Sequence, residues 1–381
     1  MSRLLHSKLK PNNLKTNHRF IISGGGTGGH IFPAIAIANA LKAKEPTCDI
    51  LFIGAEGRME MEKVPAAGYR IIGLPIQGFD RKNMIRNLRT LYLLWQSMRK
   101  AKTIIRQFRP DAVIGVGGYA SGPTLKVAAN MGIPIIIQEQ NSYAGVTNKW
   151  LASKAACCCV AYEGMERFFP KDKIVLTGNP VRQNLQTNQT DKEEAYQYFR
   201  LNPSKRTLLV IGGSLGARTI NQSILKQLDK LLQAEVQLIW QTGKYYFEQI
   251  EQETAGKISL GIVITDFISR MDYAYAVADV VISRAGACSI SELCLLGKAS
   301  ILVPSPNVAE DHQTHNAMAL VRKNAAIMIR DAEAPEKLVD VAIQLLNDEE
   351  RRKILSANCA AMAQHHSDQR IAEEIFKHIP A

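Results

Sequence analysis

The stretch of this chain best suited to chemistry is Ser23–His30, SGGGTGGH, a glycine-rich turn that ends on a histidine. Strand-like residues precede it, and a helical pattern, Phe32–Leu41, follows it. Glycines let backbone approach a ligand closely, and the first N–H groups of a helix are unpaired donors. The turn therefore suits a phosphate or another developing negative charge. His30 could take a proton from a hydroxyl or donate a hydrogen bond, and a capped structural histidine is the alternative.

A second turn of the same kind, GGSLGAR (Gly212–Arg218), lies in the other half of the chain, where Ser214 adds a hydroxyl. The first turn also has the spacing G-x-G-x-x-G of a dinucleotide site, which by itself is weak evidence. Such a site needs an acid at the end of the second strand. Asp49 stands at the start of that strand and Glu56 lies beyond its end, which argues against a nicotinamide or flavin enzyme.

Two further segments carry polar groups after apolar runs. In Ser283–Leu293, SRAGACSISEL, the carboxylate of Glu292 can accept two ribose hydroxyls, or can simply interact with the helix dipole. AEDHQTHNA (Ala309–Ala317) is interpreted as a polar pocket wall rather than a metal site. The chain has no Asp-x-Asp sequence, which argues against a metal-clamped diphosphate, so neither a metal nor a cofactor is predicted.

The elements that must position these groups follow a regular alternation of short apolar strands and helical stretches, which predicts parallel, doubly wound sheets. Strands of the first half are expected in Arg19–Gly24, Asp49–Gly54, Arg70–Ile76, Asp111–Gly118, Ile133–Asn141 and Lys173–Arg182. The pattern begins again at Thr207–Leu228 and continues in Val236–Gly243, Leu260–Phe267, Ala278–Gly286 and Ala299–Pro306. The sequence therefore predicts two tandem nucleotide-type domains, with both glycine turns lining the cleft between them.

Composition sets outer limits on the function. The 381 residues are enough for two domains, and 46% hydrophobic with 22% charged residues is typical of a globular protein. No run approaches the roughly 18 apolar residues of a membrane span. Seven cysteines without framework spacing favour the cytoplasm, and Cys157–Cys159 are expected in a buried strand. The net charge of +12 implies an anionic partner: nucleic acid, a phosphorylated substrate or an anionic membrane.

The stretch Phe79–Pro110 holds nine Lys or Arg and a single acid, with apolar residues at helical spacing. One interpretation is an ordinary helix that packs on the sheet and keeps a solvated basic face. The other is a surface that rests on an anionic membrane.

With these segments in view, the chain resembles the MurG family of peptidoglycan N-acetylglucosaminyltransferases along nearly its whole length. The resemblance rests on GGGTGGHIFPAIAIA, GVGGYASGP, QEQNSYAGVTNKWLA, GNPVR, GGSLGAR, SRAGACSISEL and DHQTHNA. It implies a GT-B fold of two Rossmann-like domains. The expected divisions are residues 1–180 for the acceptor and membrane side, 181–355 for the UDP-sugar side, and 356–381 for helices that could pack back on the first domain.

The resemblance implies inverting transfer of N-acetylglucosamine from UDP-N-acetylglucosamine to the 4-hydroxyl of N-acetylmuramic acid in undecaprenyl-pyrophosphoryl-N-acetylmuramyl-pentapeptide. It places the enzyme peripherally on the cytoplasmic face of the bacterial inner membrane. His30 is the implied catalytic residue, as base or as electrostatic helper. The implied substrate-binding residues are Thr27, Gly28, Gly29, Asn141, Arg182, Ser214, Ile268, Ala287, Cys288, Ser289, Ile290, Ser291, Glu292 and Gln313. Among these, Glu292 is expected on the ribose, the Ile268 backbone on the uracil and Gln313 on the transferred sugar.

Two other functions compete with this interpretation. A UDP-N-acetylglucosamine 2-epimerase would use the same architecture and nucleotide chemistry without a lipid acceptor, but the motifs GGTGGH and GVGGYASGP favour the transferase. A basic nucleic-acid-binding protein is supported only by the net charge, since no RNA- or DNA-binding motif is recognised.

Overall fold

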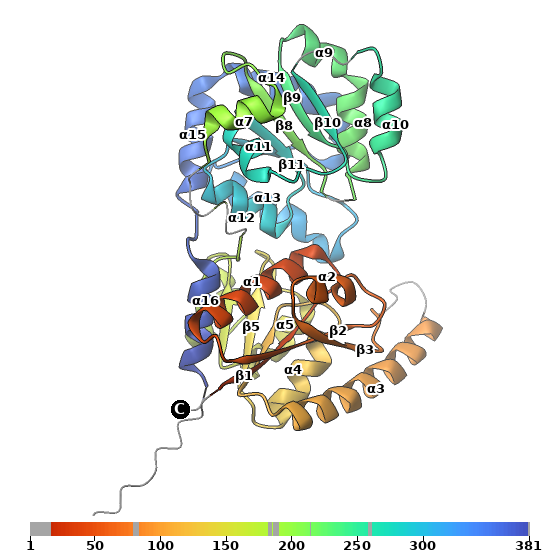
Figure 1. Cartoon of the computed structure of the whole chain (residues 1–381), viewed down its shortest axis with the longest axis vertical. Coiled ribbons are helices and arrows are strands. Elements are labelled where there is room, and N and C mark those ends of the chain that lie inside the picture. The colour runs from red at the N-terminus through yellow and green to blue at the C-terminus, as the bar shows by residue number, and fades with distance from the viewer. Residues whose placement is uncertain are drawn as a thin grey trace, which may run out of the picture.

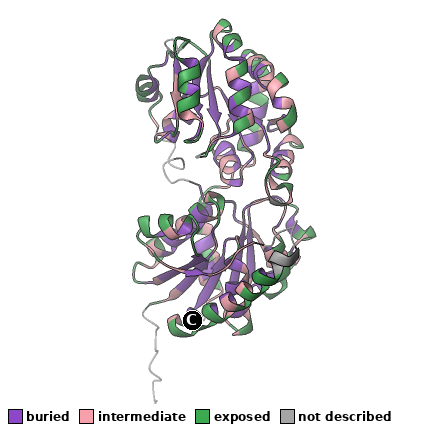
Figure 2. Cartoon of the chain, turned by 90° about the vertical axis from the view of Figure 1, so that its right-hand side faces the viewer, coloured by how far each residue is buried: buried purple, intermediate pink, exposed green. Residues whose placement is uncertain are grey.

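The structure is a computed structural model that describes residues 17–78, 84–181, 185, 190–213, 215–257 and 261–379. It consists of two α/β domains that lie one above the other along the long axis of the molecule (Figure 1). In both, the strands are buried and the outward faces of the helices are exposed (Figure 2). Strands covered on two faces must be apolar on both, which is why the sequence shows continuous apolar runs rather than alternation.

The first domain is built on a seven-stranded sheet in the order β3-β2-β1-β4-β5-β6-β7, in which every pair of neighbours is parallel. The strand bounds are β1 (Arg19–Ser23), β2 (Asp49–Ala55), β3 (Arg70–Leu74), β4 (Ala112–Gly115), β5 (Ile135–Glu139), β6 (Cys157–Val160) and β7 (Ile174–Leu176). The order reverses between β1 and β4, which is where such sheets bind ligands.

Helices and short 3-10 turns connect these strands. They are α1 (Gly28–Lys44), α2 (Glu60–Ala66), α3 (Met84–Phe108), α4 (Ser121–Asn130), α5 (Val146–Leu151), η1 (Ala152–Lys154), η2 (Met165–Arg167) and η3 (Lys171–Lys173). Apolar side chains of the sheet pack on both of its faces into two clusters, one toward α1 and one toward α3 and α4.

The second domain repeats the plan with six parallel strands in the order β10-β9-β8-β11-β12-β13. Its strands are β8 (Thr207–Ile211), β9 (Gln237–Gln241), β10 (Ile262–Thr265), β11 (Val280–Ser283), β12 (Ser300–Leu302) and β13 (Ile327–Met328). Its helices are α7 (Lys192–Phe199), α8 (Arg218–Lys226), α9 (Leu228–Gln233), α10 (Phe247–Thr254), α11 (Met271–Val277), α12 (Ala287–Leu295), η4 (Ala309–Asp311), α13 (His312–Val321), η5 (Asp331–Glu333), α14 (Ala334–Asn347) and α15 (Glu349–Ala360).

The last helix, α16 (Ser367–Lys377), returns to the first domain and packs against α1 (Figure 1). Ile371 and Ile375 on its apolar face are fully buried in the same cluster as Phe20 of β1. The ring of Phe376 also meets Phe20 edge-on, with 5.6 Å between centroids. The chain therefore crosses between the domains twice, once after β7 and once between α15 and α16.

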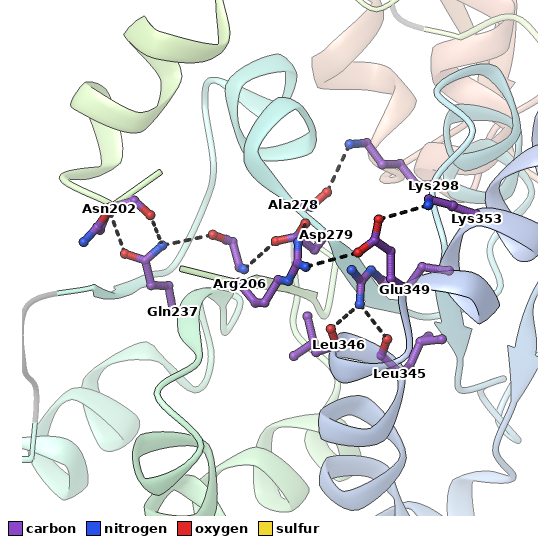
Figure 3. Close-up of polar contacts among 12 residues, drawn as sticks. Asn202, Arg206, Gln237, Ala278, Asp279, Lys298, Leu345, Leu346, Glu349 and Lys353 are labelled. Atoms are coloured by element: carbon purple, nitrogen blue, oxygen red, sulfur yellow. Dashed lines mark hydrogen bonds and ion pairs between the residues drawn. The ribbon is translucent and has the colours of Figure 1, made fainter. Parts of the chain in front are cut away.

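The amino ends of the second sheet are tied together by polar side chains (Figure 3). Gln237 accepts a hydrogen bond from the Asn202 N–H at 2.6 Å and donates to the Asn202 carbonyl at 2.9 Å. Arg206 lies between two carboxylates, 3.6 Å from Asp279 and 3.9 Å from Glu349. This end of the sheet is thus occupied by structural contacts, and the glycine turns lie at the opposite, carboxyl end.

The predicted fold class is confirmed: two parallel-sheet domains form a GT-B architecture. The three adjacent cysteines lie in β6 and are buried, as expected. The sequence reasoning missed β13, a two-residue strand at the edge of the second sheet. Among the helices that the structure describes, none is both long enough and apolar enough to cross a membrane.

Candidate active site

The glycine turn after β1 lies against the turn after β4, at the point where the strand order of the first sheet reverses. The Gly25 N–H donates to the Gly117 carbonyl at 3.2 Å. A Cβ on Gly24 would stand 2.6 Å from the Gly117 oxygen, and a Cβ on Gly118 would stand 2.3 Å from the Gly25 oxygen. Side chains are therefore excluded from this contact, which explains why the turn is so rich in glycine.

A buried carboxylate, Glu60, accepts a hydrogen bond from the glycine turn that follows β1. Glu60, at the start of α2, is 1% exposed. Its Oε2 accepts from the Gly26 N–H at 2.8 Å, and its Oε1 accepts from the Ala55 N–H at 3.0 Å. Its side chain also fills the space that a Cβ on Gly25 or Gly54 would need. Glu60 thus links the ends of β1 and β2 and fixes the path of the turn.

His30 lies in the first turn of α1, and its ring orientation is set by backbone. Its Nδ1 lies 3.0 Å from the Gly25 carbonyl oxygen and 3.3 Å from Thr27 Oγ1. A carbonyl oxygen can only accept, so Nδ1 carries the proton and Nε2 presents its lone pair. Nε2 lies beside the second turn, because a Cβ on Gly117 would stand only 2.8 Å from it.

The electrostatic environment of His30 favours the neutral ring. Burial lowers the pKa of His30 below its ordinary value of 6.5, and the nearby His312 of the second domain lowers it further. The Glu139 carboxylate and the hydrogen bond to Gly25 act in the opposite direction without reversing the shift. A neutral imidazole with a free lone pair is the form that can accept a proton.

The loop after β5, which holds Asn141, is organised around a second buried carboxylate. Glu139 Oε1 accepts from the Asn141 N–H at 3.0 Å and from Asn141 Nδ2 at 3.2 Å. Its Oε2 accepts from the Gly145 N–H at 3.0 Å and from Asn148 Nδ2 at 2.8 Å. Glu139 therefore uses both oxygens to hold the loop and the start of α5.

The second domain reaches this loop through Asn316 of α13, which is fully buried. Asn316 Oδ1 accepts from the Ser142 N–H at 2.9 Å, and its Nδ2 donates to Asn141 Oδ1 at 3.1 Å and to the Ala285 carbonyl at 3.3 Å. One side chain thus joins Asn141 to the turn that precedes α12.

Helix α12 begins opposite the glycine turn. Cys288, in its first turn, places Sγ 4.0 Å from the Gly29 carbonyl oxygen. The starts of α1 and α12 therefore meet at the boundary between the two domains. Farther along α12, Ser291 Oγ accepts from Asn179 Nδ2 at 3.1 Å and fixes the helix to the first crossing between domains.

The remaining predicted residues of the second domain lie around α12. Glu292 is buried, and its Oε2 accepts from the Tyr275 hydroxyl at 3.0 Å. The side chain of Ile268 is buried too, so only its backbone can serve a ligand; the residue lines a shallow cavity of about 370 Å³. Gln313 Oε1 accepts from the Ser305 N–H at 2.8 Å and holds the loop after β12.

The structure brings one group of predicted residues to these two helix starts: Thr27, Gly28, Gly29, His30, Ala287 and Cys288. Ser289 follows in α12, whereas Ile290 and Ser291 line a separate cavity between the domains. Arg182 and Ser214 lie outside the described residues. Within the described ranges, no group of three or more His, Cys, Asp or Glu could hold a metal ion.

Sequence reasoning missed the residues that position this site, above all Glu60, Glu139 and Asn316. Glu60 belongs to no spacing pattern, and its two partners lie at or just after the ends of different strands. Glu139 and Asn316 lie inside the motifs QEQN and DHQTHNA. The spacing of these motifs does not show that Glu139 bonds to its own loop and that Asn316 bonds to that loop from the other domain.

Comparisons with known proteins agree along nearly the whole chain. Residues 20–160 match the glycosyltransferase family 28 N-terminal domain, and residues 207–375 match the glycosyltransferase family 28 C-terminal domain. The UDP-N-acetylglucosamine--N-acetylmuramyl-(pentapeptide) pyrophosphoryl-undecaprenol N-acetylglucosamine transferase of Parabacteroides distasonis is 60% identical, covering 94% of this chain and 98% of its own. The protein of the same name from Phocaeicola vulgatus is 60% identical, covering 96% of this chain and 97% of its own. The crystal structure of Acinetobacter baumannii MurG shares 27% identity and a TM-score of 0.75, covering 94% and 99%. The chain therefore belongs to glycosyltransferase family 28 and, within it, to the MurG family.

Proposed function

We propose that this glycosyltransferase moves N-acetylglucosamine from UDP-N-acetylglucosamine to the 4-hydroxyl of the muramic acid in undecaprenyl-pyrophosphoryl-N-acetylmuramyl-pentapeptide, with inversion at the anomeric carbon. Relatives that carry this activity in their names are 60% identical over nearly the full chain. The observation that carries the proposal is His30, a neutral histidine whose lone pair lies between two glycine turns and opposite the start of α12.

The donor binds on the second domain. Glu292, oriented by Tyr275, accepts ribose hydroxyls, and the Ile268 backbone pairs with the uracil beside the shallow cavity. Gln313 already accepts a hydrogen bond through Oε1, so its Nε2 group is the one that donates to the transferred sugar. Asn141, Arg182 and Ser214 complete the donor contacts that the family resemblance implies.

The acceptor binds on the first domain, with its diphosphate at the glycine turn and the start of α1. The 4-hydroxyl of muramic acid approaches His30 Nε2, which takes the proton as the oxygen attacks the anomeric carbon from the face opposite to UDP. This displacement inverts the anomeric centre. The pKa lowered by burial keeps the imidazole unprotonated and ready for this role.

Departure of UDP places negative charge on its β-phosphate oxygens. The backbone N–H groups at the starts of α12 and α1, neither of which has a side-chain cap, are preorganised donors for that charge. No proton has to reach the leaving group, because the diphosphate is stable as an anion near neutral pH.

A single assay tests the reaction. Labelled UDP-N-acetylglucosamine and a short-chain lipid acceptor analogue should yield the disaccharide-lipid, whereas donor alone should stay largely unchanged. Conversion of the donor alone to the manno sugar would instead establish a 2-epimerase. Competition experiments with RNA address the remaining alternative, since UDP and not RNA should displace the bound donor.

We also propose that α3 holds the enzyme on the cytoplasmic face of the bacterial inner membrane. Leu88, Leu91, Tyr92 and Trp95 recur at i, i+3, i+4 and i+7, and all four are exposed, Leu88 by 70% and Trp95 by 53%. Arg99 lies over the Trp95 ring at 4.7 Å. An exposed apolar stripe with flanking cations suits a surface of anionic lipids. The helix lies on the side of the first domain that faces away from the second (Figure 1).

Vesicle binding tests this surface. Arg89→Gln with Arg99→Gln removes two charges at about 1 kcal/mol each, so partition onto anionic vesicles should fall roughly thirtyfold. Activity on a water-soluble acceptor should not change. Lys226→Gln with Lys230→Gln, on exposed helices of the second domain, removes the same charge and is the matched control. Equal losses for both pairs would contradict a membrane role of α3.

A further inference from the structure

A second cavity, of about 410 Å³, lies between the domains near the two crossings of the chain. Gly178 and Asn179 of the first crossing form one wall, and Met362 and Gln364 of the second form another. The two crossings touch, because a Cβ on Gly178 would stand 2.3 Å from the Gln364 Cβ. The volume lies within the range of small-molecule sites.

This cavity is separate from the proposed catalytic cleft. None of His30, Glu292 and Gln313 lines it. Cys288 on one side of α12 lies against Gly29, whereas Ile290 and Ser291 of the same helix line the cavity. The helix therefore stands between the two spaces.

The cavity is lined by cations from both domains. Arg167 of η2 comes from the first domain, and Arg322 and Lys323, just after α13, come from the second. Lys323 is paired with Glu163 across the domains at 2.8 Å, and Arg167 donates to the Ser142 carbonyl at 2.8 Å. These three cations and the single carboxylate, Glu163, leave the lining with a net positive charge. The exposed side chain of Arg322 makes no hydrogen bond or ion pair with any described residue.

Two residues of the lining carry a hydroxyl that has no hydrogen-bond partner among the described residues. Ser142 Oγ and Tyr162 Oη are both buried, in residues that are 5% and 9% exposed. A buried hydroxyl without a partner costs free energy, so its presence in two lining residues of one cavity points to a polar group that satisfies them. The rest of the lining combines apolar side chains, among them Met318, Met362 and Leu176, with polar ones such as His315 and Gln364.

We propose that this cavity is a ligand site for a small molecule that joins an oxyanion to an apolar body. Arg322 and Arg167 face the oxyanion, the hydroxyls of Ser142 and Tyr162 donate to it, and the methionines cover the apolar part. Because the ligand touches both domains, its binding is coupled to their relative orientation. The proposal does not depend on the sugar-transfer reaction, since none of the proposed catalytic groups takes part.

The test uses the full chain saturated with UDP, so that the donor site is filled. Phenyl phosphate and phenylacetate are titrated by calorimetry, with benzyl alcohol as the neutral counterpart. At millimolar concentrations we expect at least one of the two anions to bind and benzyl alcohol not to bind. The anion that binds identifies the preferred headgroup. No binding of either anion to the UDP-saturated chain, or equal binding of benzyl alcohol, would overturn the proposal.

Variants assign the binding to this cavity. Tyr162→Phe and Arg322→Gln should each weaken the anion about tenfold, the effect of losing one hydrogen bond to a charged group. Arg106→Gln, an exposed site on α3, is the matched control and should bind normally. Without ligand, Tyr162→Phe should melt no lower than the parent chain, because its hydroxyl has no partner to lose. Normal anion binding by both cavity variants, or a lower melting temperature of free Tyr162→Phe, would refute the assignment.

Discussion

Replacing Glu60 by Gln tests whether the glycine turn needs its buried carboxylate. The carboxylate accepts two backbone hydrogen bonds, from Gly26 and Ala55. Gln has a single oxygen, so it keeps one of these bonds and turns an NH₂ group toward the other N–H. Losing a hydrogen bond to a charged group costs about 1.5–3 kcal/mol, and the bond that remains becomes weaker because it is no longer charge-assisted. The total is about 2–4 kcal/mol.

This loss should appear in both stability and catalysis. A domain of this size loses about 2–4 °C in Tm per kcal/mol, so we expect a decrease of roughly 5–15 °C. The turn that orients His30 should also lose its fixed path. Each 1.4 kcal/mol of that loss lowers the ratio of the correct turn to its alternatives tenfold. We therefore expect kcat to fall about 10- to 100-fold, measured well below Tm, with a smaller change in donor KM.

The control is Glu56→Gln, just after β2. Glu56 is exposed and pairs with Lys100 at 2.8 Å. Surface ion pairs of this kind contribute about 0–1 kcal/mol, so this variant should keep both Tm and kcat. If Glu60→Gln behaved like Glu56→Gln in both measurements, the carboxylate would not be what holds the turn.

Three other substitutions probe the cleft. His30→Ala should lower kcat by about 10²–10⁴-fold with little change in donor KM. In the parent enzyme, the acid limb of the kcat/KM profile should lie below pH 6.5, because the lowered pKa of His30 keeps the ring neutral until the pH falls below that pKa. Wild-type kcat across pH would make His30 a structural residue. Glu292→Ala should raise donor KM roughly tenfold or more, since it removes a charged acceptor for ribose hydroxyls, and a folded variant with unchanged KM would remove Glu292 from the site. Gly117→Ala should reduce kcat strongly, because the new Cβ would stand 2.8 Å from His30 Nε2 and the residue has a φ of +90°. Normal turnover of this variant would show that the His30 ring has another productive position.

The fold could be predicted from the sequence because both sheets are parallel and covered on two faces. That arrangement requires continuous apolar strands, and β1, β2, β4, β5, β8 and β11 are all such runs. β13 was missed because two residues at a sheet edge carry no pattern. The positions of the two glycine turns could also be predicted from the sequence. Each turn contacts the backbone of a neighbouring turn too closely for a side chain, so only glycine fits there.

The supporting residues of the site could not be predicted in the same way. Glu60 acts through N–H groups at or just after the ends of two different strands, so its role exists only once β1 and β2 are paired. Asn316 bridges to a loop 174 residues earlier in the chain. Spacing within one segment carries no information on such contacts. The sequence allows two interpretations of the apolar stripe on α3, an ordinary helix packed on the sheet or a surface that rests on a membrane. The exposure of Leu88 and Trp95 supports the proposed membrane surface.

The return of α16 to the first domain changes how the two domains can move. Two bodies joined by a single linker can slide, twist and separate, but two adjacent connections remove most of these freedoms. Here the crossings touch at Gly178 and Gln364, so both connections lie at one place, and we expect relative motion of the domains to pivot about it. Atoms near the pivot scarcely shift during such a motion, whereas displacement grows in proportion to distance from it. We therefore expect a small torsional change at the crossings to produce its largest displacement in the parts of the domain boundary that lie farthest from them.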